Sequence, residues 1–140
     1  MRTEFLLYRS RTGLTARSPA CTEMLHQARG RNRALGLTGY LHLEDGRFYQ
    51  WLEGPPAAMG EVGRAVLADP RHDAVEVMWR GVQLGRHFPD WRMGFGISEA
   101  GTLFHWVAEH GVRVGDIAAF SRALLAFMLS KLAETGPGAG

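Results

Sequence analysis

The stretch Arg47-Phe48-Tyr49-Gln50-Trp51-Leu52-Glu53-Gly54 places one primary amide in an aromatic and aliphatic run. Aromatic residues favour a pleated strand, and Gly54-Pro55-Pro56 ends it. Strand alternation alone would put Gln50 on a solvated face as readily as on a buried one. Phe48 and Leu52 share its face at a period of two, which favours the buried face. We therefore predict that the amide meets polar partners in the core, because leaving it unpaired would cost roughly 1–3 kcal/mol.

Strands and helices surround this stretch in a recognisable order. We predict, in sequence, a strand over Phe5–Ser10, a helix from Ser18-Pro19, strands over Leu35–Leu43 and Arg47–Gly54, a helix from Pro55-Pro56, and strands over Ala74–Val82 and Asp90–Ile97. Asp45-Gly46 has the chemistry of a hairpin turn. This order indicates an α+β fold, a ferredoxin-like βαββαββ sandwich with two helices on one sheet face.

Two more helices are predicted towards the C-terminus, one from Ser98-Glu99 and one from Asp116. The second has an apolar stripe of Ile117, Phe120, Leu124, Met128 and Leu132. We expect both helices to cover the opposite sheet face, whose aromatic side chains would otherwise be exposed. The predicted organisation is a domain over 1–97, a helical extension over 98–134 and a disordered tail over 135–140.

Composition excludes several classes of protein. The 140 residues fit one domain with a small core, and the net charge is only +2. The single cysteine, Cys21, allows neither an internal disulfide nor a cysteine metal cluster, and the six histidines show no ligand spacing. The sequence has no membrane-spanning run and no secretory signal. We expect a cytoplasmic protein without a metal or a membrane partner.

Arginine supplies nearly all of the positive charge, and it is scattered along the chain. Two sets could form a basic patch: Arg9, Arg11 and Arg17, or Arg29, Arg31 and Arg33. Neither set is interleaved with stacking aromatic residues. We therefore do not expect nucleic acid as a partner.

The predicted topology brings three polar side chains together. The first and third strands are neighbours in a ferredoxin-like sheet, so Tyr8 should lie beside Gln50. The apolar stripe of the first helix reaches Asn32 by the i, i+4 step from Ala28, although Asn32 could equally be a C-terminal cap. A slot between the two helices should be lined by Met24, Ala28, Val62, Gly63 and Val66. Such a slot suits a flat heteroaromatic ring with hydrogen-bonding edges.

Motifs along about Phe5 to Phe95 resemble those of the BLUF family, the blue-light sensors that use flavin. They are Tyr8 near the end of the first strand, Asn32 in Ala-Arg-Gly-Arg-Asn, Gly36-Leu37-Thr38-Gly39, Asp45 to Gly54, Asp69-Pro70-Arg71-His72, and Arg86 to Met93. Arg31 stands where the family often has His or Asn. The resemblance is to the short type without an effector domain.

The resemblance implies a cofactor and a role for each matching residue. The cofactor would be FAD, which FMN or riboflavin can replace in a recombinant protein. Tyr8, Gln50, Trp91 and Met93 would carry the photocycle. The flavin would be bound by Tyr8, Met24, Ala28, Arg31, Asn32, Gln50, Val62, Gly63, Val66, Arg71 and His72. Alternation over Asp90–Ile97 would place Trp91, Met93 and Phe95 on one face, and the sequence does not tell whether Trp91 or Met93 faces the flavin.

Three functions compete at this point. The first is a photoreceptor without catalysis of its own, which passes its signal by contact to a separate regulatory protein or through self-association, since no effector follows Gly140. The second is a ferredoxin-like RNA-binding module that stacks bases on Tyr40, Tyr49 and Trp51. The third is a small acyl-phosphate hydrolase, but the sequence has no phosphate-cradling loop. We favour the photoreceptor.

Overall fold

A computed structural model describes residues 2–97 and 102–135 of the chain. The elements are β1 (Arg2–Arg11), α1 (Pro19–Leu35), β2 (Thr38–Glu44), β3 (Arg47–Gly54), α2 (Pro56–Ala68), β4 (Asp73–Leu84), β5 (Gly94–Ile97), α3 (Thr102–Glu109) and α4 (Ile117–Thr135). The strands form one sheet in the order β4-β1-β3-β2-β5, in which only the β2–β5 pair is parallel. The predicted ferredoxin-like α+β fold is confirmed.

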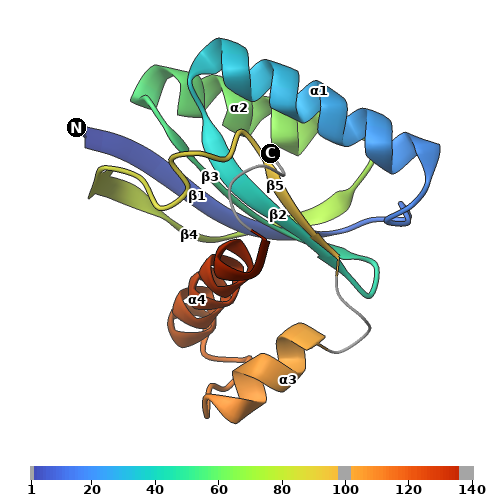
Figure 1. Ribbon diagram of the computed structural model, residues 1–140, viewed down its shortest axis with the longest axis vertical. Coiled ribbons are helices and arrows are strands. Elements are labelled where there is room, and N and C mark those ends of the chain that lie inside the picture. Colours follow the sequence, from blue (N-terminus) through green and yellow to red (C-terminus); the bar gives the residue numbers. More distant parts are fainter. Residues whose placement is uncertain (1, 98–101, 136–140) are drawn as a thin grey trace.

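Helices cover both faces of the sheet (Figure 1). Helices α1 and α2 lie on one face, α4 crosses the other, and α3 packs against α4 on the side away from the sheet. Each face has its own core cluster. Tyr8, Leu41, Phe48 and Met93 belong to the cluster under α1 and α2, whereas the cluster under α4 contains most of the large aromatic residues. Helix α4 therefore covers the aromatic face as predicted, whereas α3 packs on α4 and joins this core through Leu103 and Val107.

The boundaries of α1 follow from its capping residues. Ser18 is the N-cap and its side chain accepts a hydrogen bond from the Cys21 backbone N–H, with Pro19 at the first helical position. Gly36 ends the helix in the left-handed conformation, with φ of 71°. The predicted strand start at Leu35 is wrong, because α1 runs through Leu35 and β2 begins at Thr38.

The last strand is shorter than predicted. It begins at Gly94 rather than Asp90, so Trp91 and Met93 lie in the connection from β4 and do not share a strand face. A Cβ atom on Gly94 would come within 2.6 Å of both the Trp91 and the Tyr40 rings. The predicted helix start at Ser98-Glu99 lies outside the described residues. Within them, α3 begins at Thr102. Thr135 ends α4, and the rest of the predicted tail also lies outside them.

Burial of the aromatic face overturns the RNA-binding alternative. Tyr40, Tyr49 and Trp51 are 2%, 1% and 0% exposed, and they pack in the same cluster as Phe120 and Leu124 of α4. Bases could stack on these rings only if α4 left the sheet. The face that would serve as a stacking platform is instead a core.

A buried polar pair connects the sheet to α3. The His42 and Glu44 side chains of β2 are fully buried, and His42 Nε2 lies 3.0 Å from Glu44 Oε1. Both Glu44 oxygens also accept from the Leu103 backbone N–H in the first turn of α3, at 3.0 and 3.1 Å. The His42 ring meets Phe127 of α4 edge to face. This pair therefore joins β2 to both C-terminal helices.

We expect stability to fall in acid because of His42. Burial lowers the pKa of His42 below its usual value near 6.5, although Glu44 opposes the shift and Lys131 adds to it. The folded chain keeps His42 neutral, whereas the unfolded chain binds a proton at this residue below about pH 6.5. The stabilisation from His42 is therefore fully present above pH 6.5 and is lost as the pH falls below it. The loss has a limiting slope of about 1.4 kcal/mol per pH unit.

Urea unfolding between pH 7 and pH 5 measures this slope. His42→Phe should flatten it while keeping a ring against Phe127. Replacement of the exposed His26 by Gln is the control and should keep the parent slope. A slope that His42→Phe leaves unchanged would contradict the assignment.

Candidate functional site

Tyr8 and Gln50 lie side by side on the sheet face that α1 and α2 cover. They are direct partners in the antiparallel register of β1 and β3, and both are buried. The Tyr8 hydroxyl donates to Gln50 Oε1, and Gln50 Nε2 donates to Met93 Sδ at 3.3 Å. The buried amide thus has the polar partners that the sequence predicted. Because Met93 accepts from it, Met93 faces this site, while Trp91 packs in the cluster on the opposite face.

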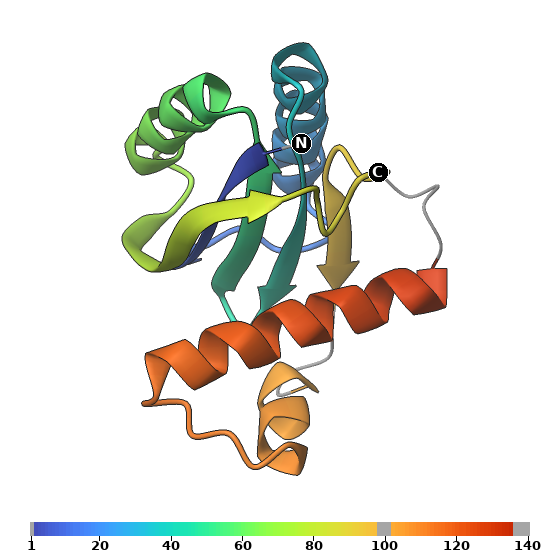
Figure 2. The same ribbon diagram turned by 90° about the vertical axis from the view of Figure 1, so that its left-hand side faces the viewer.

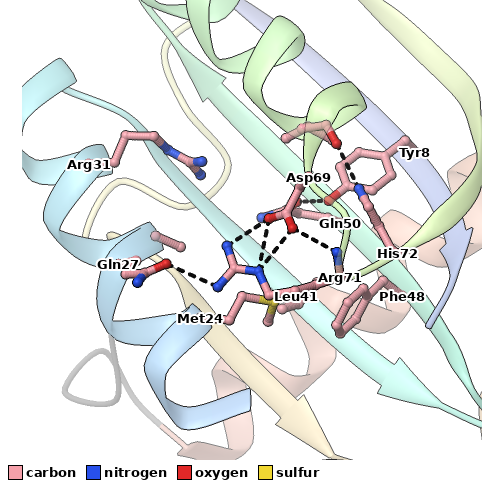
Figure 3. A pocket seen from close by; sticks show the side chains of 12 residues that line it. Tyr8, Met24, Gln27, Arg31, Leu41, Phe48, Gln50, Asp69, Arg71 and His72 are labelled. Carbon is pink, nitrogen blue, oxygen red and sulfur yellow. Dashed lines mark hydrogen bonds and ion pairs between the residues drawn. The ribbon is translucent and has the colours of Figure 1, made fainter. Parts of the chain in front are cut away.

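A pocket of about 240 Å³ opens above this pair, between α1 and the loop after α2 (Figure 3). Tyr8, Gln50, Leu41 and Phe48 supply its floor from the sheet. The remaining lining residues come from α1, α2 and the loop that follows: Met24, Gln27, Ala28, Arg31, Val66, Asp69, Arg71 and His72. The pocket is a slot of mixed character, which five apolar side chains and seven polar or charged ones line together.

Burial sets the protonation state of Tyr8. It raises the pKa of the phenol well above its usual range, an effect that the Arg31 charge opposes and the Asp69 charge reinforces. The phenol therefore keeps its proton at neutral pH and can donate it to Gln50. Arg31 Nε is buried beside the pocket without a hydrogen-bond partner among the described residues. This nitrogen has no accessible surface, so a ligand in the pocket could accept from it only after the Arg31 side chain moves.

Arg71 crosses the pocket between the loop and α1, as Figure 3 shows. Its guanidinium binds both Asp69 oxygens and also donates to Gln27 Oε1 at 3.0 Å. The hydrogen bond from Arg71 lowers the pKa of the Asp69 carboxyl. The Arg71 and Asp69 side chains are 33% and 24% exposed, so this bridge lies at the mouth of the pocket.

His72 closes the end of the pocket in a single tautomer. Its Nε2 lies 2.7 Å from the Val66 carbonyl oxygen, which can only accept, so Nε2 carries a hydrogen. Its Nδ1 lies 2.7 Å from Ser10 Oγ and accepts from that hydroxyl in the neutral ring. The ring meets the Tyr8 ring edge to face at 5.8 Å. His72 thus fixes the position of Tyr8 from the side.

Asn32 is fully buried but does not line the pocket. Its Nδ2 donates to the Arg92 carbonyl oxygen, and Arg29 Nε donates to the Met93 carbonyl oxygen at 3.0 Å. Helix α1 therefore holds the segment that carries Met93. Val62 is buried in the core below α2, and Gly63 lines a separate groove between α2 and β4. The structure does not bring these three predicted binding residues to the pocket surface.

A family model described as "Sensors of blue-light using FAD" matches residues 4–94. The chain belongs to the BLUF family. It is a blue-light sensor that uses a flavin, and the site around Tyr8 and Gln50 lies within the matched residues.

Several solved structures have the same fold as this chain. BlrB, a BLUF protein in its dark state, matches with a TM-score of 0.70 at 30% identity, over 90% of this chain and 97% of that chain. Klebsiella pneumoniae BlrP1, solved as a manganese and cyclic-diGMP complex, matches with a TM-score of 0.66 at 27% identity, over 99% of this chain but 35% of that chain. The photo-activated state of BlsA gives a TM-score of 0.73 at 19% identity over 92% of this chain and 95% of that one, which shows the fold alone.

Curated relatives of the BLUF segment include much longer proteins. Photoactivated adenylate cyclase subunit beta of Euglena gracilis is 35% identical over 71 residues, which is 51% of this chain. The matched part is only 8% of that relative. The chain thus spans a small fraction of the length of the curated relatives it matches.

Sequence reasoning missed Gln27, Asp69, Leu41 and Phe48 as lining residues of the BLUF site. The signal for Gln27 was its spacing, because it lies on one helical face with Met24, Ala28 and Arg31. Across the described residues, no cluster of His, Cys, Asp and Glu could hold a metal ion. Within residues 2–97 and 102–135, no helix has the length and apolar character needed to span a bilayer.

Proposed function

We propose that the pocket above Tyr8 and Gln50 holds the flavin ring, and that these two side chains switch their hydrogen bonds under blue light. The observation that carries the proposal is the buried chain of donors and acceptors from Tyr8 through Gln50 to Met93. The pocket above it combines apolar side chains with several polar groups, which can contact the faces and the edges of a flat cofactor.

The residues around the pocket fit a flavin. Met24, Ala28 and Val66 offer apolar contacts to the ring faces, and the Gln50 amide and the Arg31 side chain supply polar groups in the same lining. The Arg71 guanidinium would have to leave its bridge to Gln27. That rearrangement is cheap, because a partly exposed polar contact of this kind is worth only about 0–1 kcal/mol. Val62, Gly63 and Asn32 would support the site from behind, rather than touch the ring as the sequence suggested.

Tyr8 and Gln50 would carry the switch. When bound, the flavin would supply a strong oxidant on absorbing blue light. Tyr8 would give up and regain one electron and one proton in each cycle, so nothing is consumed. During that interval Gln50 can rotate, or change tautomer, and exchange its oxygen and nitrogen. After rotation the amide would donate towards Tyr8 where it now accepts, and its oxygen would face Met93 Sδ.

We propose FAD as the natural cofactor, because the family description names it. Mass analysis of flavin released from protein purified from cells, and titration of the flavin-free protein with riboflavin, FMN and FAD, would test this choice. Protein that takes up none of the three would contradict the proposed site.

The signal would leave the domain through residues 91–93, towards self-association or a separate regulatory protein. Met93 contacts the switch amide, while Trp91 packs against Tyr40 in the cluster that α4 covers. Trp91 and Met93, with only Arg92 between them, therefore lie on the output side and the flavin side of the sheet. Hydrogen exchange in dark and lit states should differ between residues 93 and 132, and identical protection there alongside a normal light response would place the exit elsewhere.

A further inference from the structure

The connection over residues 85–93 crosses the end of the sheet from one edge to the other. It leaves β4 at one edge and enters β5 at the opposite edge, as Figure 2 shows in yellow. On the way it passes the end of β3 and the start of β2. Met93 stands at its end, where Asn32 and Arg29 of α1 donate to the Arg92 and Met93 carbonyl oxygens. The path of this connection and these two bonds together set where the Met93 sulfur lies relative to Gln50.

Glu53, at the end of β3, holds this connection. Its side chain is 0% exposed, and its carboxylate accepts five hydrogen bonds. Two come from the connection itself, from the backbone N–H groups of His87 at 2.9 Å and Phe88 at 2.7 Å. The others come from Trp51 Nε1, Gln83 Nε2 and Thr38 Oγ1.

All five partners are donors, so both oxygens of the Glu53 side chain must accept hydrogen bonds. Trp51 Nε1, Gln83 Nε2 and His87 N approach Oε1, while Phe88 N and the Thr38 hydroxyl approach Oε2. A glutamine in this place would turn an NH₂ group towards one of the two sets and leave at least one buried backbone N–H without an acceptor.

Glu53 also links the two sheet faces. It lies three residues after Gln50 on β3. Strand β3 therefore contacts the connection at two points: Glu53 accepts from His87 near the start of the connection, and Gln50 donates to Met93 at its end. Between these points Phe88 is fully buried, and the Gly39 N–H donates to the Trp91 carbonyl oxygen at 2.9 Å. The connection is therefore held along its length and has little slack between Glu53 and Met93.

We infer that Glu53 is a positioning residue of the light switch, whose carboxylate sets the path of residues 85–93 and so presses the Met93 sulfur against the Gln50 amide. The inference rests on the proposed function of Tyr8 and Gln50. Loss of the carboxylate should release Met93, remove the weak bond that restrains the amide, and speed the return of the lit state to the dark state.

Glu53→Gln in the flavin-loaded full chain tests this directly. We expect the light-induced absorption change to form and then to decay about tenfold faster than in the parent. Gln83→Leu is the matched control, because it removes one donor to Oε1 and leaves both backbone bonds of the connection in place. Its recovery should stay near the parent rate.

A double-mutant comparison separates positioning from a general loss of structure. If Glu53 acts through the Met93 sulfur, Glu53→Gln should have little further effect in a Met93→Leu background. A full tenfold acceleration in that background would overturn the inference, as would an unchanged recovery rate in Glu53→Gln alone. Should Glu53→Gln fail to fold, Glu53→Asp keeps a carboxylate but draws it back from the His87 and Phe88 N–H groups, and the same comparison applies.

A measurement in the dark needs no photocycle. The His87 and Phe88 amides should be protected from hydrogen exchange in the parent, and Glu53→Gln should lower that protection about a hundredfold. Equal protection in the two proteins would overturn the inference. A parent protein without any light response would overturn the proposed function, and this inference with it; a normal parent response with an additive double mutant would overturn this inference alone.

Discussion

Tyr8→Phe is expected to bind flavin as the parent does and to lose the light-induced red shift of the flavin band completely. The phenylalanine ring fills the same volume against His72 and the pocket floor, so the binding surface is kept. Only the hydroxyl is lost, and with it the donor to Gln50 Oε1 and the group proposed to release an electron and a proton. Absorption spectra before and after illumination, together with flavin titration, measure both effects.

The control for this variant is Tyr49→Phe. Tyr49 is equally buried, but it lies in the cluster under α4, on the sheet face away from the pocket. The Tyr49→Phe variant should keep a normal red shift. A normal red shift in Tyr8→Phe would remove Tyr8 from the mechanism, and loss of flavin from that variant would show that its hydroxyl serves binding.

The second large effect is expected from Leu124→Ala in α4, which should lower the free energy of unfolding by about 2–5 kcal/mol. Leu124 is 0% exposed and packs in the cluster with Phe5, Leu7 and Trp51 of the sheet. Truncation leaves a cavity between α4 and the sheet. Domains of this size have a total stability of about 5–15 kcal/mol, so the loss is a large share of it. Urea unfolding followed by circular dichroism measures it.

Exposed positions on the same helix provide the comparison. Arg122→Ala, two residues away and exposed, should change stability by less than about 0.5 kcal/mol. If Leu124→Ala were no more harmful than Arg122→Ala, α4 would not be packed on the sheet in solution. The aromatic face would then be open, and the RNA-binding alternative would return.

The central part of the site could be predicted from sequence because it depends on sheet topology. A ferredoxin-like order makes β1 and β3 neighbours, and alternation places Tyr8 and Gln50 on one face. Helical periodicity placed Asn32 inside in the same way. The sequence predicted an apolar stripe on α4 and an aromatic sheet face, and neither had another surface to cover it. That was sufficient to predict that the two pack together.

The direction of Trp91 and Met93 could not be predicted, because it depends on an irregular segment. Had the strand begun at Asp90, alternation would have put both side chains on one face. The strand begins at Gly94, and the preceding turn sends Trp91 to the α4 side and Met93 to the side of Tyr8 and Gln50. The anchor of that turn is Glu53, for which the sequence predicted no such role. Its role arises from residues 30 or more positions away in the chain, and no local pattern reveals it.

Gly63 illustrates a second limit. The sequence placed this glycine in the wall of the predicted slot, but an added Cβ there meets no atom within 4 Å. Gly63 faces the groove between α2 and β4 instead. A stripe of apolar residues predicts the rotation of a helix about its axis only to within about one residue, and packing against the sheet sets the rest.

The most direct test of the account is the absorption spectrum of the purified, flavin-loaded protein before and after blue light. We predict a yellow protein whose flavin band shifts slightly to the red on illumination and returns in the dark. A colourless protein that takes up no added flavin, or a bound flavin whose spectrum does not change under blue light, would contradict it.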